Sequence, residues 1–109
     1  MFTQLSDFSE THFDSQNNIT VYFTRLRDRV VSVSYDENHN VYIVCLNNPN
    51  FDPATDLDSP VWNYTSWDSP LLLDFCTESL ETALETANRF LTKENLPTYH
   101  PEYLPTSDI

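Results

Sequence analysis

The chain contains no glycine in 109 residues. Glycine averages about 7% of residues in globular proteins and enters the left-handed backbone region without steric cost. Asparagine tolerates that region next best, and asparagines stand where turns are needed: Asn17, Asn18, Asn38, Asn40, Asn47, Asn48, Asn50 and Asn95. We therefore expect turns closed by asparagine. The lack of glycine also excludes the glycine-rich phosphate loops of nucleotide-binding folds.

Three segments have the pattern of β-strands. Residues 19–26 and 30–35 alternate apolar and polar side chains, as half-buried strands do. Residues 41–46 are apolar on both faces, which is typical of a central strand. Short turns at 26–29 and 36–40 separate the three, so they predict an antiparallel meander. In the first strand we expect one face to carry Ile19, Val21 and Phe23. In the second strand we expect one face to carry Val31, Val33 and Tyr35.

One helix is predicted over residues 77–94, with Thr77 as its N-cap. Its apolar side chains recur at helical spacing: Leu80, Ala83, Leu84, Ala87 and Leu91. Glu85 and Arg89 are spaced for an ion pair across one turn.

Together these segments predict a single α+β domain over residues 1–109. It has an antiparallel sheet of three to five strands and one main amphipathic helix packed on one face. Segments 61–65 and 71–75 are the candidates for the fourth and fifth strands. Residues 1–18 form an N-terminal segment with a short helix, and residues 97–109 form an extended tail rich in proline and tyrosine.

The charge of the chain is strongly one-sided, with seventeen acidic and five basic residues and a net charge of -12. A magnitude of roughly 2–8 is usual for a small domain. No Lys or Arg occurs between Arg29 and Arg89, a span that holds Asp36, Glu37, Asp52, Asp56, Asp58, Asp68, Asp74, Glu78, Glu81 and Glu85. Self-repulsion of this size destabilises a compact state, so we expect the surplus charge to meet a basic partner.

Direct binding to nucleic acid or to an acidic membrane surface is disfavoured, because phosphate contacts need a basic face. Only Arg25, Arg27 and Arg29 cluster, and we expect them to balance nearby acids such as Asp28. The chain has neither a signal-peptide pattern at its start nor an apolar run of membrane-spanning length. The cytoplasm is the expected compartment.

No catalytic or cofactor motif is present, so we expect no enzyme, no cofactor and no metal. His12, His39 and His100 lack zinc-ligand spacing. The trio Asp52, Asp56 and Asp58 lacks the spacing and the glycine of a calcium loop. An enzyme that used paired carboxylates, Asp74 with Glu78, is a third-ranked alternative.

The two cysteines, Cys45 and Cys76, are expected to be small buried hydrophobic residues. The alternative is a reactive Cys76 whose pKa is lowered by the helix N-terminus.

The hypothesis that fits best is a non-enzymatic inhibitor that occludes a basic, nucleic-acid-handling protein by placing carboxylates where phosphates would bind. The partner-binding candidates are Asp52, Asp56, Asp58, Trp62, Trp67, Glu78, Glu81 and Glu85. They combine one acidic helical stripe with a loop in which acids surround aromatics, the residues frequent at interface hot spots. In the alternative interpretation the tryptophans complete the core and the acids are simply solvated.

In size and acidity the chain is similar to phage-encoded anti-restriction and anti-CRISPR proteins and to toxin immunity proteins. This resemblance is compositional and carries over no residues. The alternative function is an accessory or adaptor subunit of a larger complex, docking through the aromatic loop and the tail that contains Tyr99 and Tyr103.

Overall fold

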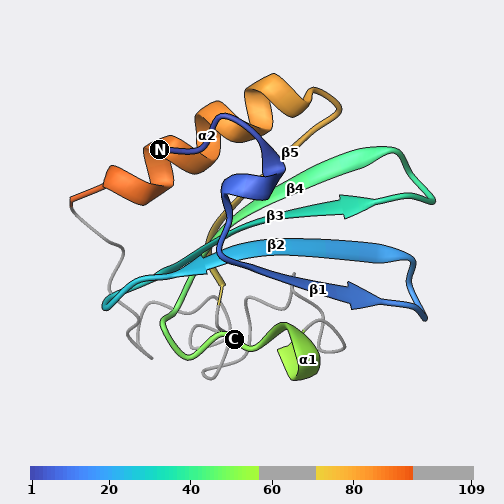
Figure 1. The fold of residues 1–109 in the computed structure, drawn as a ribbon, viewed down its shortest axis with the longest axis horizontal. Coiled ribbons are helices and arrows are strands. Elements are labelled where there is room, and N and C mark those ends of the chain that lie inside the picture. Colours follow the sequence, from blue (N-terminus) through green and yellow to red (C-terminus); the bar gives the residue numbers. More distant parts are fainter. Residues whose placement is uncertain (57–70, 95–109) are drawn as a thin grey trace, which may run out of the picture.

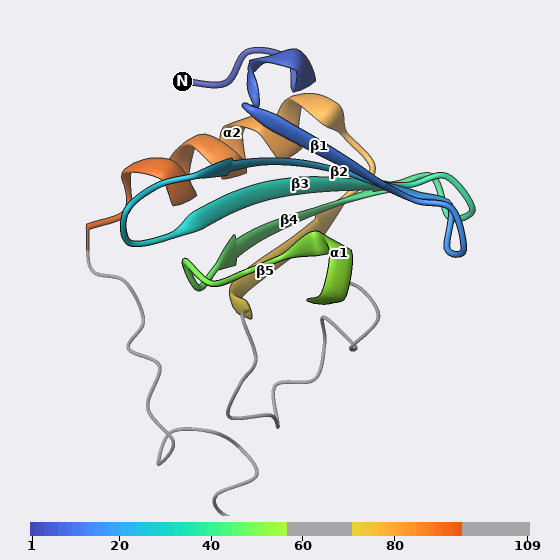
Figure 2. The ribbon, with the colours of Figure 1, turned by 60° about the horizontal axis from the view of Figure 1, so that its bottom comes forward.

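The computed structural model describes residues 1–56 and 71–94 (Figure 1). Its elements in chain order are the 3-10 helix η1 (Leu5–Asp7), β1 (Glu10–Asp14), β2 (Ile19–Arg25), β3 (Val30–Asp36), β4 (Val41–Asn47), α1 (Pro53–Asp56), β5 (Leu71–Thr77) and α2 (Leu80–Thr92). The strands form one five-stranded antiparallel sheet in the order β1-β2-β3-β4-β5. Helix α2 packs on one face, which confirms the predicted α+β architecture (Figures 1 and 2).

Both faces of the central strands β3 and β4 are buried. The sequence predicts this for β4, whereas its alternation predicts a half-buried β3, whose Ser32 and Ser34 are in fact buried as well. Towards α2, the fully buried side chains of the sheet are Val31, Val33, Val44 and Leu46. They pack against Ala83, Leu84 and Ala87 of α2. On the opposite face, Val21, Phe23 and Val30 pack with Phe51, whose ring meets that of Phe23 edge-on at 6.5 Å. Strand β4 is therefore central and covered, which explains its apolar run.

Asparagine closes two of the three hairpin turns that join β1 to β4, as the absence of glycine predicts. Asn18 and Asn40 have φ angles of 57° and 53°, in the left-handed region. Asp14 and Asp36, which end β1 and β3, accept backbone N–H bonds inside their own turns. A side-chain hydrogen bond from Asn17 contributes most to lowering the pKa of Asp14. These carboxylates therefore help to build the turns.

The helix starts later than predicted. Its N-cap is Ser79, whose hydroxyl accepts a hydrogen bond from the Thr82 N–H at 3.1 Å. Thr77 is the last residue of β5 and lies opposite Tyr42 in the sheet. Because Thr77 is paired with β4 as part of β5, it cannot serve as the N-cap of the helix. Helix α2 also ends at Thr92, two residues before the predicted end.

The N-terminal segment contains a strand that the sequence did not reveal. The predicted short helix is the 3-10 turn η1, and β1 then pairs with β2 at the edge of the sheet. The sequence of β1 is mostly polar, and Phe13 within it is 53% exposed. Because this edge strand buries so little surface, its sequence does not alternate apolar and polar residues, and alternation is the pattern that would have predicted it. The candidate strand 61–65 and the tail 97–109 lie outside the described residues.

The N-terminal segment also completes the core, because it lies beside α2 on the same face of the sheet (Figure 1). Phe2 and Phe8 stack with ring centroids 3.9 Å apart, and both are buried in the cluster that contains Val31 and Val33. The apolar face thus has two covers, α2 and residues 2–8. In the part of the chain that the structure describes, no helix is long and apolar enough to cross a membrane.

Substituting Phe8→Ala should destabilise the fold by about 3–5 kcal/mol, because it empties a buried aromatic site. Phe13→Ala is the matched control on β1, and its exposed side chain predicts a change within about 0.5 kcal/mol. Urea unfolding of both variants measures the difference. Equal effects would contradict the role of residues 2–8 as a cover of the core.

Candidate functional site

All five Lys and Arg residues lie at one end of the molecule. Arg25, Arg27 and Arg29 lie at or next to the β2–β3 turn, and Arg89 and Lys93 lie at the end of α2. Figure 1 shows the turn and the helix end on the left. We call this set of residues the basic end.

Arg29 joins the two parts of the basic end. Its side chain is 9% exposed, and its Nη1 donates to the carbonyl oxygens of Phe90 at 2.7 Å and Leu91 at 3.3 Å. Its Nε and Nη2 each donate to the Asp28 carboxylate at 3.1 Å. These hydrogen bonds hold the pKa of Asp28 below its ordinary value. Arg29 thus supplies donors to carbonyls that the end of α2 leaves without helical partners.

Arg25 is also engaged within the fold. It forms an ion pair with Glu10 at 3.5 Å and donates to the carbonyl oxygen of Phe51 at 2.7 Å. Its guanidinium carbon lies 5.3 Å from the centre of the Phe23 ring. The expectation that this arginine cluster balances neighbouring acids is therefore confirmed for Arg25 and Arg29.

Several acidic residues lie towards the other end, on the β1–β2 turn, the β3–β4 turn and the first half of α2 (Figure 1). The residues of this acidic end are Asp14, Asp36, Glu37, Glu78, Glu81 and Glu85. Asp36 contacts His39 at 2.7 Å, whereas Glu37, Glu78, Glu81 and Glu85 are exposed. Arg89 lies one helical turn after Glu85, but no ion pair with Lys or Arg is formed by these acids among the described residues.

The predicted pair between Glu85 and Arg89 is absent from the ion pairs of residues 1–56 and 71–94. Arg89 instead donates to the Thr86 hydroxyl at 3.1 Å. The predicted helical stripe is also shorter than expected, because Glu78 precedes the helix that starts at Leu80. Two carboxylates on successive turns of α2, Glu81 and Glu85, therefore remain as the helical part of the site.

The five predicted partner-binding residues that the structure describes lie in two separate regions. Glu78, Glu81 and Glu85 lie on the α2 side of the sheet. Asp52 and Asp56 belong to the α1 region on the opposite side (Figure 2). Asp52 accepts a hydrogen bond from the Ala54 N–H at 3.0 Å, which caps α1 locally. Three further predicted residues lie outside the described residues: Asp58, Trp62 and Trp67.

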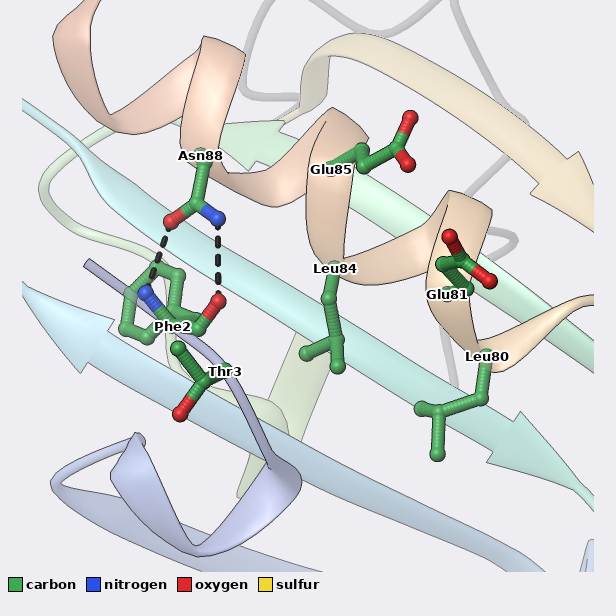
Figure 3. A pocket seen from close by; sticks show the side chains of 7 residues that line it. All are labelled: Phe2, Thr3, Leu80, Glu81, Leu84, Glu85 and Asn88. Carbon is green, nitrogen blue, oxygen red and sulfur yellow. Dashed lines mark hydrogen bonds between the residues drawn. The ribbon is translucent and has the colours of Figure 1, made fainter.

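A hollow of about 360 Å³ opens between the N-terminal segment and the first turns of α2 (Figure 3). Its lining residues are Phe2, Thr3, Leu80, Glu81, Leu84, Glu85 and Asn88. Leu80 is 37% exposed and offers apolar surface to the space, and the neighbouring Leu84 is largely buried in the core. The carboxylates of Glu81 and Glu85 stand on the helix above these leucines. Two residues of the predicted site thus border a pocket that sequence reasoning missed.

Two hydrogen bonds hold the hollow together at one end. The Asn88 Oδ1 accepts from the Phe2 N–H at 2.7 Å, and the Asn88 Nδ2 donates to the Phe2 carbonyl oxygen at 2.9 Å. Thr3 is fixed through Asp7, whose carboxylate accepts from the Thr3 N–H and hydroxyl at 2.8 and 2.9 Å. These bonds lower the pKa of Asp7. The amide of Asn88 and the hydroxyl of Thr3 are therefore already engaged within the fold.

Neither cysteine has the features of an activated thiol. Cys45 is buried, and burial raises its pKa far above the ordinary value. Cys76 is exposed on β5, which corrects the expectation that both are buried. Its pKa is raised by partial burial and by the nearby Asp74 carboxylate, so the alternative of a lowered pKa is wrong. The cause is position, because Cys76 lies in a strand and not at the start of α2.

Residues 1–56 and 71–94 contain no group of three or more His, Cys, Asp or Glu side chains arranged to hold a metal ion. Comparison of the chain with family models, with curated proteins and with solved structures found no match. The separated charges and the hollow beside α2 are the features from which function can be argued.

Replacing Arg29 with Met should destabilise the fold by about 2–3 kcal/mol, because the carbonyls of Phe90 and Leu91 lose a charged, buried donor. Arg27→Met removes the same charge from an exposed position and should change stability by less than about 0.5 kcal/mol. Urea unfolding compares the two. A loss of the same size in both variants would mean that net charge, and not the contact with α2, is what Arg29 provides.

Proposed function

We propose that this protein binds a basic, nucleic-acid-handling protein and occludes the surface that the partner uses for phosphate. The observation that carries the proposal is the uneven distribution of charge: every Lys and Arg lies at the basic end together with Glu10, Asp28 and Glu94, whereas the acidic end holds four exposed glutamates and no Lys or Arg. Charged surfaces of one sign attract and orient partners of the opposite sign. An acidic end of this kind is suited to a groove that evolved to hold phosphates.

The state of the arginines supports the same proposal. Arg25 and Arg29 are bound to acids and carbonyls within the fold, so they offer little to an external polyanion. Binding to nucleic acid requires several free cations on one face. The chain is thus better suited to imitate a nucleic acid than to bind one.

The geometry of α2 supports an interface on its exposed side. Glu81 and Glu85 are separated by one helical turn, so their Cβ atoms lie about 5–6 Å apart. Burial of Ala83, Leu84 and Ala87 against the sheet holds the helix in place. The carboxylates are therefore presented on a rigid element, and little ordering is needed on binding.

We place this protein in the same functional class as anti-restriction, anti-CRISPR and toxin immunity proteins, which act by stoichiometric occlusion. Its role in this proposal is non-enzymatic and needs no cofactor. The interaction is expected in the cytoplasm, where a nucleic-acid-handling partner would be reached.

The test is retention of basic proteins from a lysate of the source cells on the immobilised full chain, at about 50 mM and about 200 mM salt. Retention should fall steeply with salt, and added DNA or RNA should displace the retained protein. Glu81→Gln combined with Glu85→Gln should weaken retention by about tenfold, because it removes two contacts of the acidic end.

The matched control is Glu10→Gln combined with Glu94→Gln, which removes the same charge from the basic end and should have little effect. Glu10 takes part only in an exposed ion pair, the kind that contributes little to stability. If retention of the partner does not change with salt and is not reduced by added nucleic acid, the result would contradict occlusion of a phosphate-binding surface and favour an adaptor function. Equal effects of the two double variants would contradict a localised acidic end.

A further inference from the structure

We propose that the hollow beside α2 receives an arginine side chain of the basic partner. This inference rests on the proposed function and names the contact made at the site. The hollow combines an apolar floor with two carboxylates at its rim, and an arginine side chain has an aliphatic stem that ends in a cation. Each part of the pocket thus has a counterpart in the occupant.

The floor is suited to the stem. Leu80 and Leu84 project into the space from α2, and Phe2 closes it from the N-terminal segment (Figure 3). Leu80 is 37% exposed, so it can lose further water-accessible surface when a stem covers it. Long basic side chains bury their methylene groups along apolar surface while the charge stays at the edge.

The rim is suited to the charge. Glu81 and Glu85 both line the hollow, and none of the other five lining residues carries a charge. Among the described residues, Arg89 is the cation nearest in sequence, and it is hydrogen-bonded to Thr86. The polar groups of Thr3 and Asn88 are taken by Asp7 and by the Phe2 backbone. The two carboxylates are therefore the acceptors that an entering cation would meet.

The arrangement favours arginine over lysine. A guanidinium presents five donors in a planar fork that matches carboxylates, and it is less strongly hydrated than an ammonium group. Two carboxylates on successive turns can engage different edges of one fork. The volume of about 360 Å³ is near the lower limit of ligand pockets, about 300–1,000 Å³, which suits one long side chain.

The pocket is also held open before binding. The side-chain amide of Asn88 forms hydrogen bonds with both the N–H and the carbonyl oxygen of Phe2. The stacked rings of Phe2 and Phe8 pack in the core and hold the same segment in place. The wall that faces α2 is therefore fixed, and the entering side chain meets a preformed site.

The test uses the isotope-labelled full chain titrated with capped hexa-arginine and with capped hexalysine, followed by amide chemical shifts. We expect the largest shifts at Thr3, Leu80 and Leu84, with hexa-arginine binding several-fold more tightly than hexalysine. Leu80→Ala should weaken hexa-arginine binding by roughly three- to tenfold, because it removes apolar floor without changing charge. The same spectra report whether this variant is folded.

Glu81→Gln combined with Glu85→Gln provides a second variant and should abolish the preference for arginine. The control Glu10→Gln with Glu94→Gln should retain it. Two results would contradict binding of arginine in the hollow: chemical shift changes spread evenly over Asp14, Asp36 and Glu37, or hexa-arginine affinity that is unchanged in Leu80→Ala. Neither result would contradict salt-dependent occlusion of the partner. Shifts at Thr3 and Leu84 that depend on protein concentration without peptide would assign the hollow to a second copy of the chain and also contradict binding of arginine there. If the hollow binds arginine but nucleic acid does not displace the retained partner, the proposed function is contradicted while the arginine contact is supported.

Discussion

The structure depends on covering one apolar face of the sheet. Strands β3 and β4 place Val31, Val33, Val44 and Leu46 on that face, and all four are fully buried. Each such side chain contributes about 1.5–3 kcal/mol when it leaves water, so this face is the largest source of stability in the described core. Helix α2 covers part of it, and residues 2–8 cover the rest. The hollow lies where these two covers meet, so the candidate binding site is a consequence of how the core is closed.

The same arrangement determines where the charges lie. Because α2 packs through Ala83, Leu84 and Ala87, its residues Glu81 and Glu85 are exposed. Arg29 binds the carbonyls at the end of α2 and so ties the arginines of the β2–β3 turn to the helix. Arg25 and Arg29 thus secure one end of the fold, and the exposed glutamates at the other end form no ion pair with Lys or Arg among the described residues. Such an arrangement costs stability through repulsion between like charges, a cost that binding to a cationic surface would relieve.

Much of this fold could be predicted from local patterns, and the parts that could not have physical reasons. Strands β2, β3 and β4 alternate or run apolar because one or both faces are buried, and the asparagines at positive φ follow from the absence of glycine. Strand β1 escaped detection because an exposed edge strand needs no apolar alternation. The choice of Ser79 over Thr77 as N-cap depends on how far β5 pairs with β4, which is a tertiary effect.

The candidate site could be predicted only in part. Glu81 and Glu85 stood out because they lie in a base-free span and opposite an apolar stripe. The hollow beside them depends on contacts between Phe2 and Asn88, which are 86 positions apart in sequence. No periodicity links positions so distant. The sequence groups Asp52 and Asp56 with the helical acids because all of them lie in the base-free span, whereas the structure places α1 and α2 on opposite sides of the sheet.

The central claim is that the acidic end carries exposed glutamates that form no ion pair with Lys or Arg among the described residues. The most direct measurement is the free energy of unfolding in urea as sodium chloride rises from about 10 mM to about 1 M, a range over which the screening length falls from about 30 to about 3 Å. The account predicts that salt stabilises the protein, and that Glu81→Gln with Glu85→Gln raises stability at low salt and reduces this gain. The control Glu10→Gln with Glu94→Gln should have a much smaller effect on both the stability at low salt and the gain in stability with salt. Stability that falls with salt, or an equal response of both double variants, would contradict a concentrated, uncompensated acidic end.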